Sequence, residues 1–231
     1  MTKSRDTANI IKQPFTQTLG TSNYRAGVNA GNSITSGGNY NVTVGDEAGT
    51  AITTGDQNVA VGFEALKANT TGQRNTALGW NALLSNTTAQ GNTAVGAYAG
   101  DSNTTGADNT FIGYDTAPAN TTGASNTSLG SGSLHANTTA SNNTAVGYQA
   151  GYANTTGTRI SAFGRSSLSS NTTGNYNTGL GYYALQANTT ASYNTAIGHD
   201  TMKSLVGGGA TNNTAVGVSA MNATTTGANN S

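Results

Sequence analysis

The chain has 231 residues, of which only 34% are hydrophobic, 6% aromatic and 8% charged. Its nine basic and nine acidic residues cancel, which excludes the basic surface that nucleic acids and anionic membranes require. The absence of cysteine excludes disulfides and thiolate metal sites, and no apolar run approaches the ~20 residues of a helix inserted in a membrane.

Residues 1–23 differ in composition from the rest of the chain. They contain the only apolar cluster outside the repeats, made of Ile10, Ile11, Pro14 and Phe15, and no apolar stretch of signal-peptide length. We interpret this stretch as an attachment segment that docks onto a larger assembly, and a frayed terminus is an equally good interpretation.

Residues 24–40 resemble a degenerate first coil of the repeat, because Gly38-Asn39-Tyr40 echoes Gly174-Asn175-Tyr176. A capping coil at this place would protect the end of a stack of repeats, as solenoids require.

An almost unbroken repeat of 17 residues fills residues 41–231. Its consensus is N-T-A-V-G-x-x-A-L-x-x-N-T-T-G-x-x, and we number the unit positions from the leading Asn. Eleven coils begin between Asn41 and Asn213, the last of them after a coil of 19 residues. The period is too short for helical hairpins, which need about 33 residues. The β-branched Thr and Val, bounded by Gly and Asn, predict an all-β parallel solenoid with two short strands and two corners in each coil.

Glycine is invariant at unit position 5, where we expect a corner with positive φ or a close approach between backbones. These structural corner glycines are Gly45, Gly62, Gly79, Gly96, Gly113, Gly130, Gly147, Gly164, Gly181, Gly198 and Gly217. The Asn-Thr-Thr sequence late in the unit is expected to supply the second corner, because Asn tolerates left-handed geometry.

Asparagine occupies unit position 1 in ten of the eleven coils. Stacked at about 4.8 Å per coil, these side chains would form an amide ladder of the kind that stabilises cross-β stacks. The expected members are Asn41, Asn58, Asn75, Asn92, Asn109, Asn126, Asn143, Asn177, Asn194 and Asn213. The ladder explains the asparagines as structural residues.

Unit positions 3 and 4 should face opposite sides of a strand. Position 4 is always apolar, from Val44 to Val216, and we expect it to fill the interior. Position 3 is nearly always small, as at Ala60 and Ala77, and a small apolar residue on an outer face suits contact with another chain. The pattern therefore favours an oligomer.

Residues with catalytic or metal-binding potential are few and scattered. His135 and His199 stand at different unit positions, and the adjacent acids Asp46 and Glu47 fit a solvated corner. The regularly spaced glycines lack the Lys-Ser/Thr of a phosphate-binding loop. We expect no enzyme activity, no catalytic residue, no cofactor and no bound metal.

Unit position 6 is aromatic in five coils, at Phe63, Trp80, Tyr114, Tyr148 and Tyr182. In register on the outside, these rings could stack on the sugars of a host surface glycan. Packing against the next coil or subunit is the favoured interpretation. The longer coil carries residues 204–209 where Asn-Thr-Thr should be, which indicates an outward loop and a harmless insertion.

The sequence Asn-Thr-Ala-Val-Gly-Tyr-Gln-Ala of residues 143–150 and Asn-Thr-Ala-Leu-Gly of residues 75–79 resemble the repeats of two related groups. One is the head of trimeric autotransporter adhesins, and the other is the fibre and tail-fibre proteins of bacteriophages. The similarity covers residues 41–229 and implies a left-handed parallel β-roll with three chains side by side. The phage group fits better, because an autotransporter needs a signal peptide and a C-terminal membrane barrel.

The resemblance implies a structural fibre of a virion, such as a tail fibre, a short fibre or a capsid-attached fibre. We expect a homotrimer that binds a virion attachment protein through residues 1–23, assembles in the host cytoplasm and offers a repetitive surface to host cells. Two alternatives remain open. One is a monomeric solenoid that binds ice or a polysaccharide through threonines at the predicted corners, and the other is a subunit of a bacterial extracellular adhesive filament.

Overall fold

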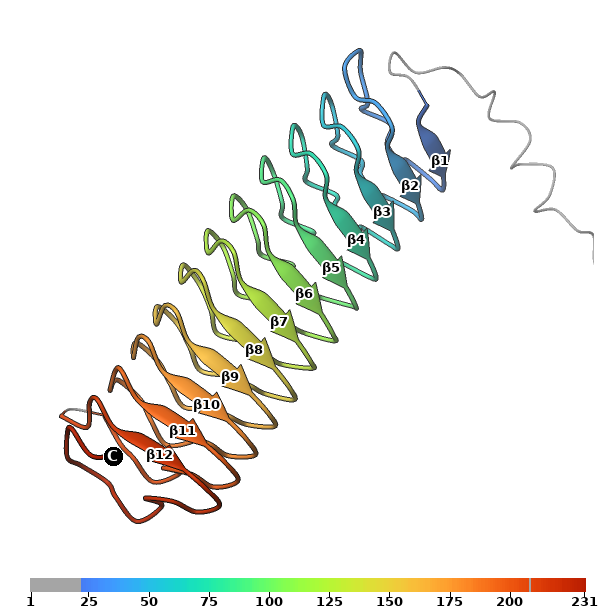
Figure 1. Ribbon diagram of the computed structural model, residues 1–231. Helices are drawn as coiled ribbons and strands as arrows, with labels where there is room; N and C mark the ends of the chain where they lie inside the picture. Colours follow the sequence, from blue (N-terminus) through green and yellow to red (C-terminus); the bar gives the residue numbers. More distant parts are fainter. Residues whose placement is uncertain (1–21, 208) are drawn as a thin grey trace, which may run out of the picture.

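The computed structural model describes residues 22–207 and 209–231, so Ile10, Ile11, Pro14 and Phe15 of the expected attachment segment lie outside the described residues. The described chain is a rod built from a single parallel sheet of twelve strands, which follow one another in chain order (Figure 1). The strands are β1 (Tyr24–Ala26), β2 (Val42–Val44), β3 (Val59–Val61), β4 (Thr76–Leu78), β5 (Thr93–Val95), β6 (Thr110–Ile112), β7 (Thr127–Leu129), β8 (Thr144–Val146), β9 (Ser161–Phe163), β10 (Thr178–Leu180), β11 (Thr195–Ile197) and β12 (Thr214–Val216). No helix occurs in these described residues. The predicted all-β parallel solenoid is confirmed.

The strands pair in exact register with the repeat. Thr76 lies opposite Thr93, and Leu78 lies opposite Val95, so like residues stack on like residues. The longer coil keeps this register, because Ile197 pairs with Val216 and the extra residues are accommodated outside the strand. At about 4.8 Å per strand, the stack is on the order of 50 Å long.

Residues 24–40 form a coil that joins the sheet through β1. Arg25 stands at unit position 3 of this coil, opposite Thr43 in β2, and its guanidinium Nη1 donates a hydrogen bond to the Gly31 carbonyl at 2.8 Å. A polar side chain thus takes the place that alanine fills in most later coils.

Each coil contains one strand, so the predicted second strand is wrong. The rest of the coil consists of turns in which non-glycine residues adopt left-handed φ, for example Glu64 at 55° and Leu66 at 53°. The turns nevertheless pair between coils: Leu66 N donates to Ala82 O at 2.9 Å, and Thr70 N donates to Thr87 O at 2.8 Å. Hydrogen bonds between stacked turns pair the backbone N–H and C=O groups, as the bonds between strands do. This side of the coil therefore needs no strand.

The prediction of which strand residues face inward is also wrong. Ala60 and Ala77 at position 3 are fully buried, whereas Leu78 at position 4 is 45% exposed. In coils with leucine at position 9, that side chain reaches across the interior and leaves little room at position 3. At Gly179, an added Cβ would lie 2.5 Å from Oγ of Ser167 and 3.3 Å from Cγ of Leu168. Alanine therefore faces the core, and the larger aliphatic residue faces outward.

Candidate functional site

The corner glycines of unit position 5 all have φ values that an L side chain rarely adopts, from 115° at Gly164 to 142° at Gly79. They also lie where successive backbones meet, since a Cβ on Gly45 would stand 2.6 Å from the carbonyl oxygen of Gly62. Gly217 has the same φ region, but an added Cβ there would meet only the Ala220 Cβ at 3.9 Å.

The asparagines of unit position 1 form a buried ladder along the rod. The Oδ1 of Asn58 accepts a hydrogen bond from the backbone N–H of Asn75 at 3.0 Å, and its Nδ2 donates to the Gly72 carbonyl at 2.9 Å. The same pattern reaches Asn23 and Asn230 in the flanking coils, which the sequence analysis did not include. Ile160 interrupts the ladder, because its hydrocarbon side chain offers no acceptor to the next coil.

A second buried ladder occupies unit position 12, where the sequence analysis expected only a corner. Nδ2 of Asn86 donates to Oδ1 of Asn69 at 2.9 Å and to the Ala89 carbonyl at 3.2 Å. Its members are Asn69, Asn86, Asn103, Asn120, Asn137, Asn154, Asn171 and Asn188. The ladder ends at Leu205 in the longer coil, which leaves Oδ1 of Asn188 without a partner.

The aromatic residues of unit position 6 lie on the outside of the rod, and most of them contact another side chain along it. Trp80 lies 5.2 Å from Tyr98, and the Tyr98 ring meets Tyr114 edge-on at 6.2 Å, each distance measured between ring centroids. The Arg165 guanidinium lies 5.7 Å from the Tyr148 ring and 5.6 Å from the Tyr182 ring. Four residues of unit position 6, Trp80, Tyr114, Tyr148 and Tyr182, therefore each contact a side chain of a neighbouring coil. Phe63 is about half exposed and has no ring contact among the described residues.

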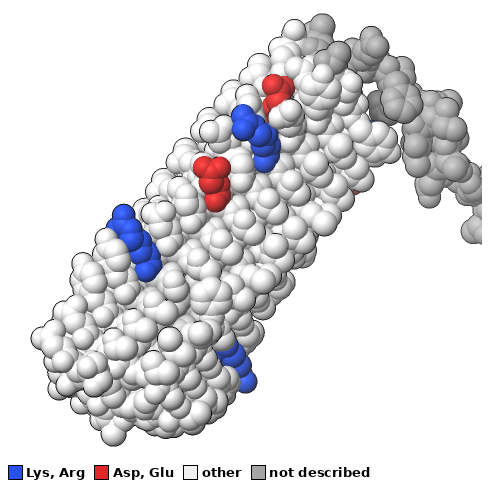
Figure 2. Space-filling model, viewed as in Figure 1, with Lys and Arg blue, Asp and Glu red and all other residues white. Residues whose placement is uncertain are grey.

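The outer face of the sheet carries two columns of side chains, one from unit position 2 and one from position 4. From β4 onward position 2 is threonine, with a serine in β9, and position 4 is aliphatic except for Phe163. Leu129, Leu180 and Val216 are 42%, 46% and 68% exposed. Neither column contains a charged residue, and charged side chains are few and far apart on the side of the rod seen in Figure 2. The face is a regular, uncharged and partly apolar strip along the whole sheet.

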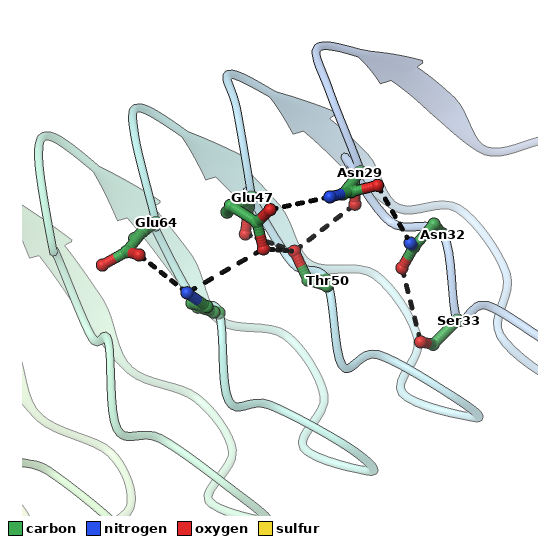
Figure 3. Close-up of polar contacts among 7 residues, drawn as sticks. Asn29, Asn32, Ser33, Glu47, Thr50 and Glu64 are labelled. Carbon is green, nitrogen blue, oxygen red and sulfur yellow. Dashed lines mark hydrogen bonds and ion pairs between the residues drawn. The ribbon is translucent and has the colours of Figure 1, made fainter.

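A polar network joins the first coils on the outside (Figure 3). Lys67 lies 2.7 Å from Glu64 Oε1 and 3.8 Å from Glu47 Oε2, and Glu47 Oε1 accepts a hydrogen bond from Asn29 Nδ2 at 2.7 Å. The bond to Glu64 is the main cause that raises the pKa of Lys67 above its ordinary value. Asp46 Oδ1 accepts the Val28 N–H at 2.9 Å, so Asp46 and Glu47 both link neighbouring coils.

Two histidines and one group of buried hydroxyls form the remaining polar clusters. His135 lies 3.3 Å from Asp115 and stacks on Tyr152, and His199 lies 3.3 Å from Asp200 and stacks on Tyr182. The buried hydroxyls of Thr116, Ser128 and Ser133 hydrogen-bond to one another inside the core.

Within residues 22–207 and 209–231, no group of three or more His, Cys, Asp or Glu side chains is placed to hold a metal ion. The same residues include no helix that is long and apolar enough to cross a membrane. Comparison with known proteins found no matching family model, no matching curated protein and no matching solved structure.

Proposed function

We propose that this protein is a structural fibre of a virion, and that three copies associate side by side through the outer face of the sheet. The observation that carries the proposal is the uncharged strip of Thr and aliphatic side chains along that face, on a rod whose interior is filled by alanine, leucine and two asparagine ladders.

A long exposed apolar strip is unusual on a monomeric soluble protein and marks a surface that contacts a partner. Because the strip repeats every coil, a second copy lying alongside meets the same residues along the whole rod. Ile197 and Val216 of position 4 lie on the outside, 36% and 68% exposed. The contact between chains in this proposal therefore uses unit positions 2 and 4, and not position 3 as expected from the sequence. Closed rotational symmetry allows three such faces to meet around one axis.

The virion assignment rests on the resemblance of the 17-residue unit to phage fibre repeats. In this proposal residues 1–23 dock onto a virion attachment protein, and the sides of the rod contact the host surface weakly and at many points, gaining strength from copy number.

The first test is the native mass, measured by light scattering during size exclusion. One chain has a mass of 23.1 kDa, and we expect about three times that value with an elongated elution profile. The double variant Leu129→Lys/Ile197→Lys places charges on the strip and should yield monomers with an unchanged circular dichroism spectrum. Gln90→Lys/Thr156→Lys, at exposed turn positions, is the matched control and should remain trimeric. A monomeric wild-type protein would overturn the side-by-side assembly.

The virion assignment has its own test. Electron microscopy with antibodies against the rod should label the particle surface, and particles lacking the protein should lose the fibre or adsorb poorly. Normal structure together with normal adsorption would contradict the assignment.

A specific observation also favours the monomeric surface-binding alternative. The threonines of unit position 2, such as Thr76 and Thr93, lie on the strand face, whereas the sequence analysis placed the regular threonines at corners. Hydroxyls repeated at about 4.8 Å on a sheet suit a periodic solid such as ice or a crystalline polysaccharide. Thermal hysteresis or binding to insoluble polysaccharide by a monomeric protein would support this alternative, and neither would appear if the face is buried in a trimer.

A further inference from the structure

Arg165 differs from the other cations of the described chain in the way it is held. It stands at unit position 6, in the same column as Tyr148 one coil before and Tyr182 one coil after. Its guanidinium carbon lies within 6 Å of both ring centroids, at 5.7 and 5.6 Å, which is the range of a cation–π contact. His199 continues the column by stacking on Tyr182 at 5.0 Å.

Arg165 is exposed, and its side chain makes no hydrogen bond or ion pair with any described residue. In contrast, Lys67 pairs with Glu64, Lys203 pairs with Asp200 at 3.2 Å, and Arg159 donates to the Tyr176 hydroxyl at 2.6 Å. The two rings therefore position the Arg165 guanidinium while its N–H donors keep no protein acceptor. A guanidinium held in this way loses little side-chain freedom when it binds an oxyanion through two parallel hydrogen bonds.

The surroundings of Arg165 provide sugar-binding chemistry next to the cation. Tyr183 packs against Tyr182 with ring centroids 3.9 Å apart, and Lys203 Nζ lies 4.4 Å from the centre of the Tyr183 ring. The hydrogen bond with Tyr183 is the main cause that raises the pKa of the Tyr182 phenol, so this group stays neutral at physiological pH. The hydroxyls and partly exposed rings of these tyrosines contact a pyranose, while the Arg165 guanidinium attracts negative charge.

The other aromatic column members lack this combination. Trp80 and Tyr114 each contact Tyr98, and the exposed cation Arg74 has no ring contact among the described residues. Both the rings around Tyr98 and those around Arg165 lie on the outside of the rod. Within the described part of the chain, an arginine that contacts two rings and has no hydrogen-bonded or ionic partner occurs only in the coils of residues 143–212.

We propose that Tyr148, Arg165, Tyr182 and Tyr183 form a binding site for an acidic saccharide, in which Arg165 binds the carboxylate or phosphate and the tyrosines contact the sugar ring. The inference rests on the proposed function, since it names the class of host glycan that the fibre contacts. In a trimer the site occurs three times around the rod, so weak single-site binding adds up on a densely coated surface.

The test uses the full chain and multivalent conjugates measured by biolayer interferometry. Conjugates of 3′-sialyllactose and of a galacturonate oligosaccharide carry carboxylates, a mannose-6-phosphate conjugate carries phosphates, and a lactose conjugate is the neutral reference. We expect at least one acidic conjugate to bind at least tenfold more tightly than lactose, and which one binds separates a carboxylate from a phosphate ligand. Equal binding of acidic and neutral conjugates would overturn the proposal.

Two variants make the site assignment specific. Arg165→Gln should weaken binding to the acidic conjugate at least tenfold, whereas Arg74→Gln, an exposed arginine without a ring contact, should leave it unchanged. Equal losses in both variants would indicate general charge attraction and would also overturn the site. Native mass is measured on each variant, so that failure of trimer assembly is recognised separately from failure of saccharide binding.

Discussion

The ring of Phe111 occupies the space that a side chain on Gly100 would need, because a Cβ on Gly100 would overlap the Phe111 ring. Phe111 stands at unit position 3, which is alanine in most coils, and it is fully buried. Gly100 and Ala117 stand at position 9, where Leu66 and Leu83 fill the core of earlier coils. A large residue on one side of the narrow interior is thus matched by small residues on the other.

Replacing Phe111 by Ala should therefore destabilise the rod by about 3–5 kcal/mol, as expected for emptying a buried phenylalanine site. The double variant Phe111→Ala/Gly100→Leu restores the common Ala and Leu pattern and should recover at least half of that loss. Leucine is tolerated at this backbone position, since Leu83 has a φ of 50° and Gly100 one of 58°. Chemical unfolding midpoints measure both effects, and a double variant no more stable than Phe111→Ala would contradict the explanation.

Substitutions at two corner glycines distinguish the cost of backbone strain from the cost of close contact between coils. Gly113 and Gly217 have φ values of 140° and 126°, so Ala is strained at both positions. At Gly113 the added Cβ would also lie 2.8 Å from the carbonyl oxygen of Gly130. We expect Gly217→Ala to cost about 1–3 kcal/mol and Gly113→Ala to cost distinctly more, as measured by thermal unfolding. Equal losses would mean that the close approach of coils contributes nothing.

The position 12 ladder can be tested at its centre. Asn120 donates to Oδ1 of Asn103 at 2.7 Å and accepts a hydrogen bond from Nδ2 of Asn137 at 2.7 Å. Asn120→Ala leaves the Asn103 oxygen buried without a donor, which should lower the free energy of unfolding by about 2–3 kcal/mol. Gln90→Ala, at an exposed turn position, is the control and should change stability by less than about 0.5 kcal/mol. Similar effects of the two substitutions would contradict a stabilising ladder.

The partial burial of Asp101 predicts how the stability of the fold depends on pH. Burial raises its pKa above the ordinary value of 3.8, and hydrogen bonds from Ser102 offset part of this effect. The folded state then binds a proton more tightly than the unfolded state, so this group adds stability as the pH falls through its folded pKa toward the unfolded value. Asp101→Asn should be more stable than wild type at pH 7, by less than about 1 kcal/mol because the carboxyl is partly exposed. The difference in melting temperature should shrink at pH 3.5, and a constant difference would contradict the burial effect.

The spacing of Asn and Gly was sufficient to predict the solenoid, its coil length and its parallel register. The inward face was not predictable in the same way. Because side chains alternate along a strand, Ala77 and Leu78 must point in opposite directions, but this rule does not determine which of them points inward. That choice depends on the width of the interior, which is set by Leu66 and Leu83 on the opposite side of the coil and by no local feature of the strand.

The second asparagine ladder could have been predicted from the same signal as the first. Asn occurs at position 12 in eight successive coils, from Asn69 to Asn188, a regularity as strict as that of position 1. Its neighbours Thr and Gly suggested a turn, and the structure shows that a turn residue can also point its side chain into the core, where Asn69 is fully buried. The Arg165 site combines residues from three successive coils, so only the coil-to-coil stacking places Tyr148, Arg165 and Tyr182 together.

Residues 58–193 consist only of coils of 17 residues, and this uniformity affects how such a gene can evolve. Removing or duplicating one whole unit joins the end of a coil to the start of another that offers the same corner glycine and, except at Ile160, the same asparagine. The backbone hydrogen bonding is then preserved, and the core packing is preserved wherever the joined coils carry the common Ala and Leu pattern. Unequal recombination between copies therefore yields rods that differ in reach by steps of about 4.8 Å and still fold.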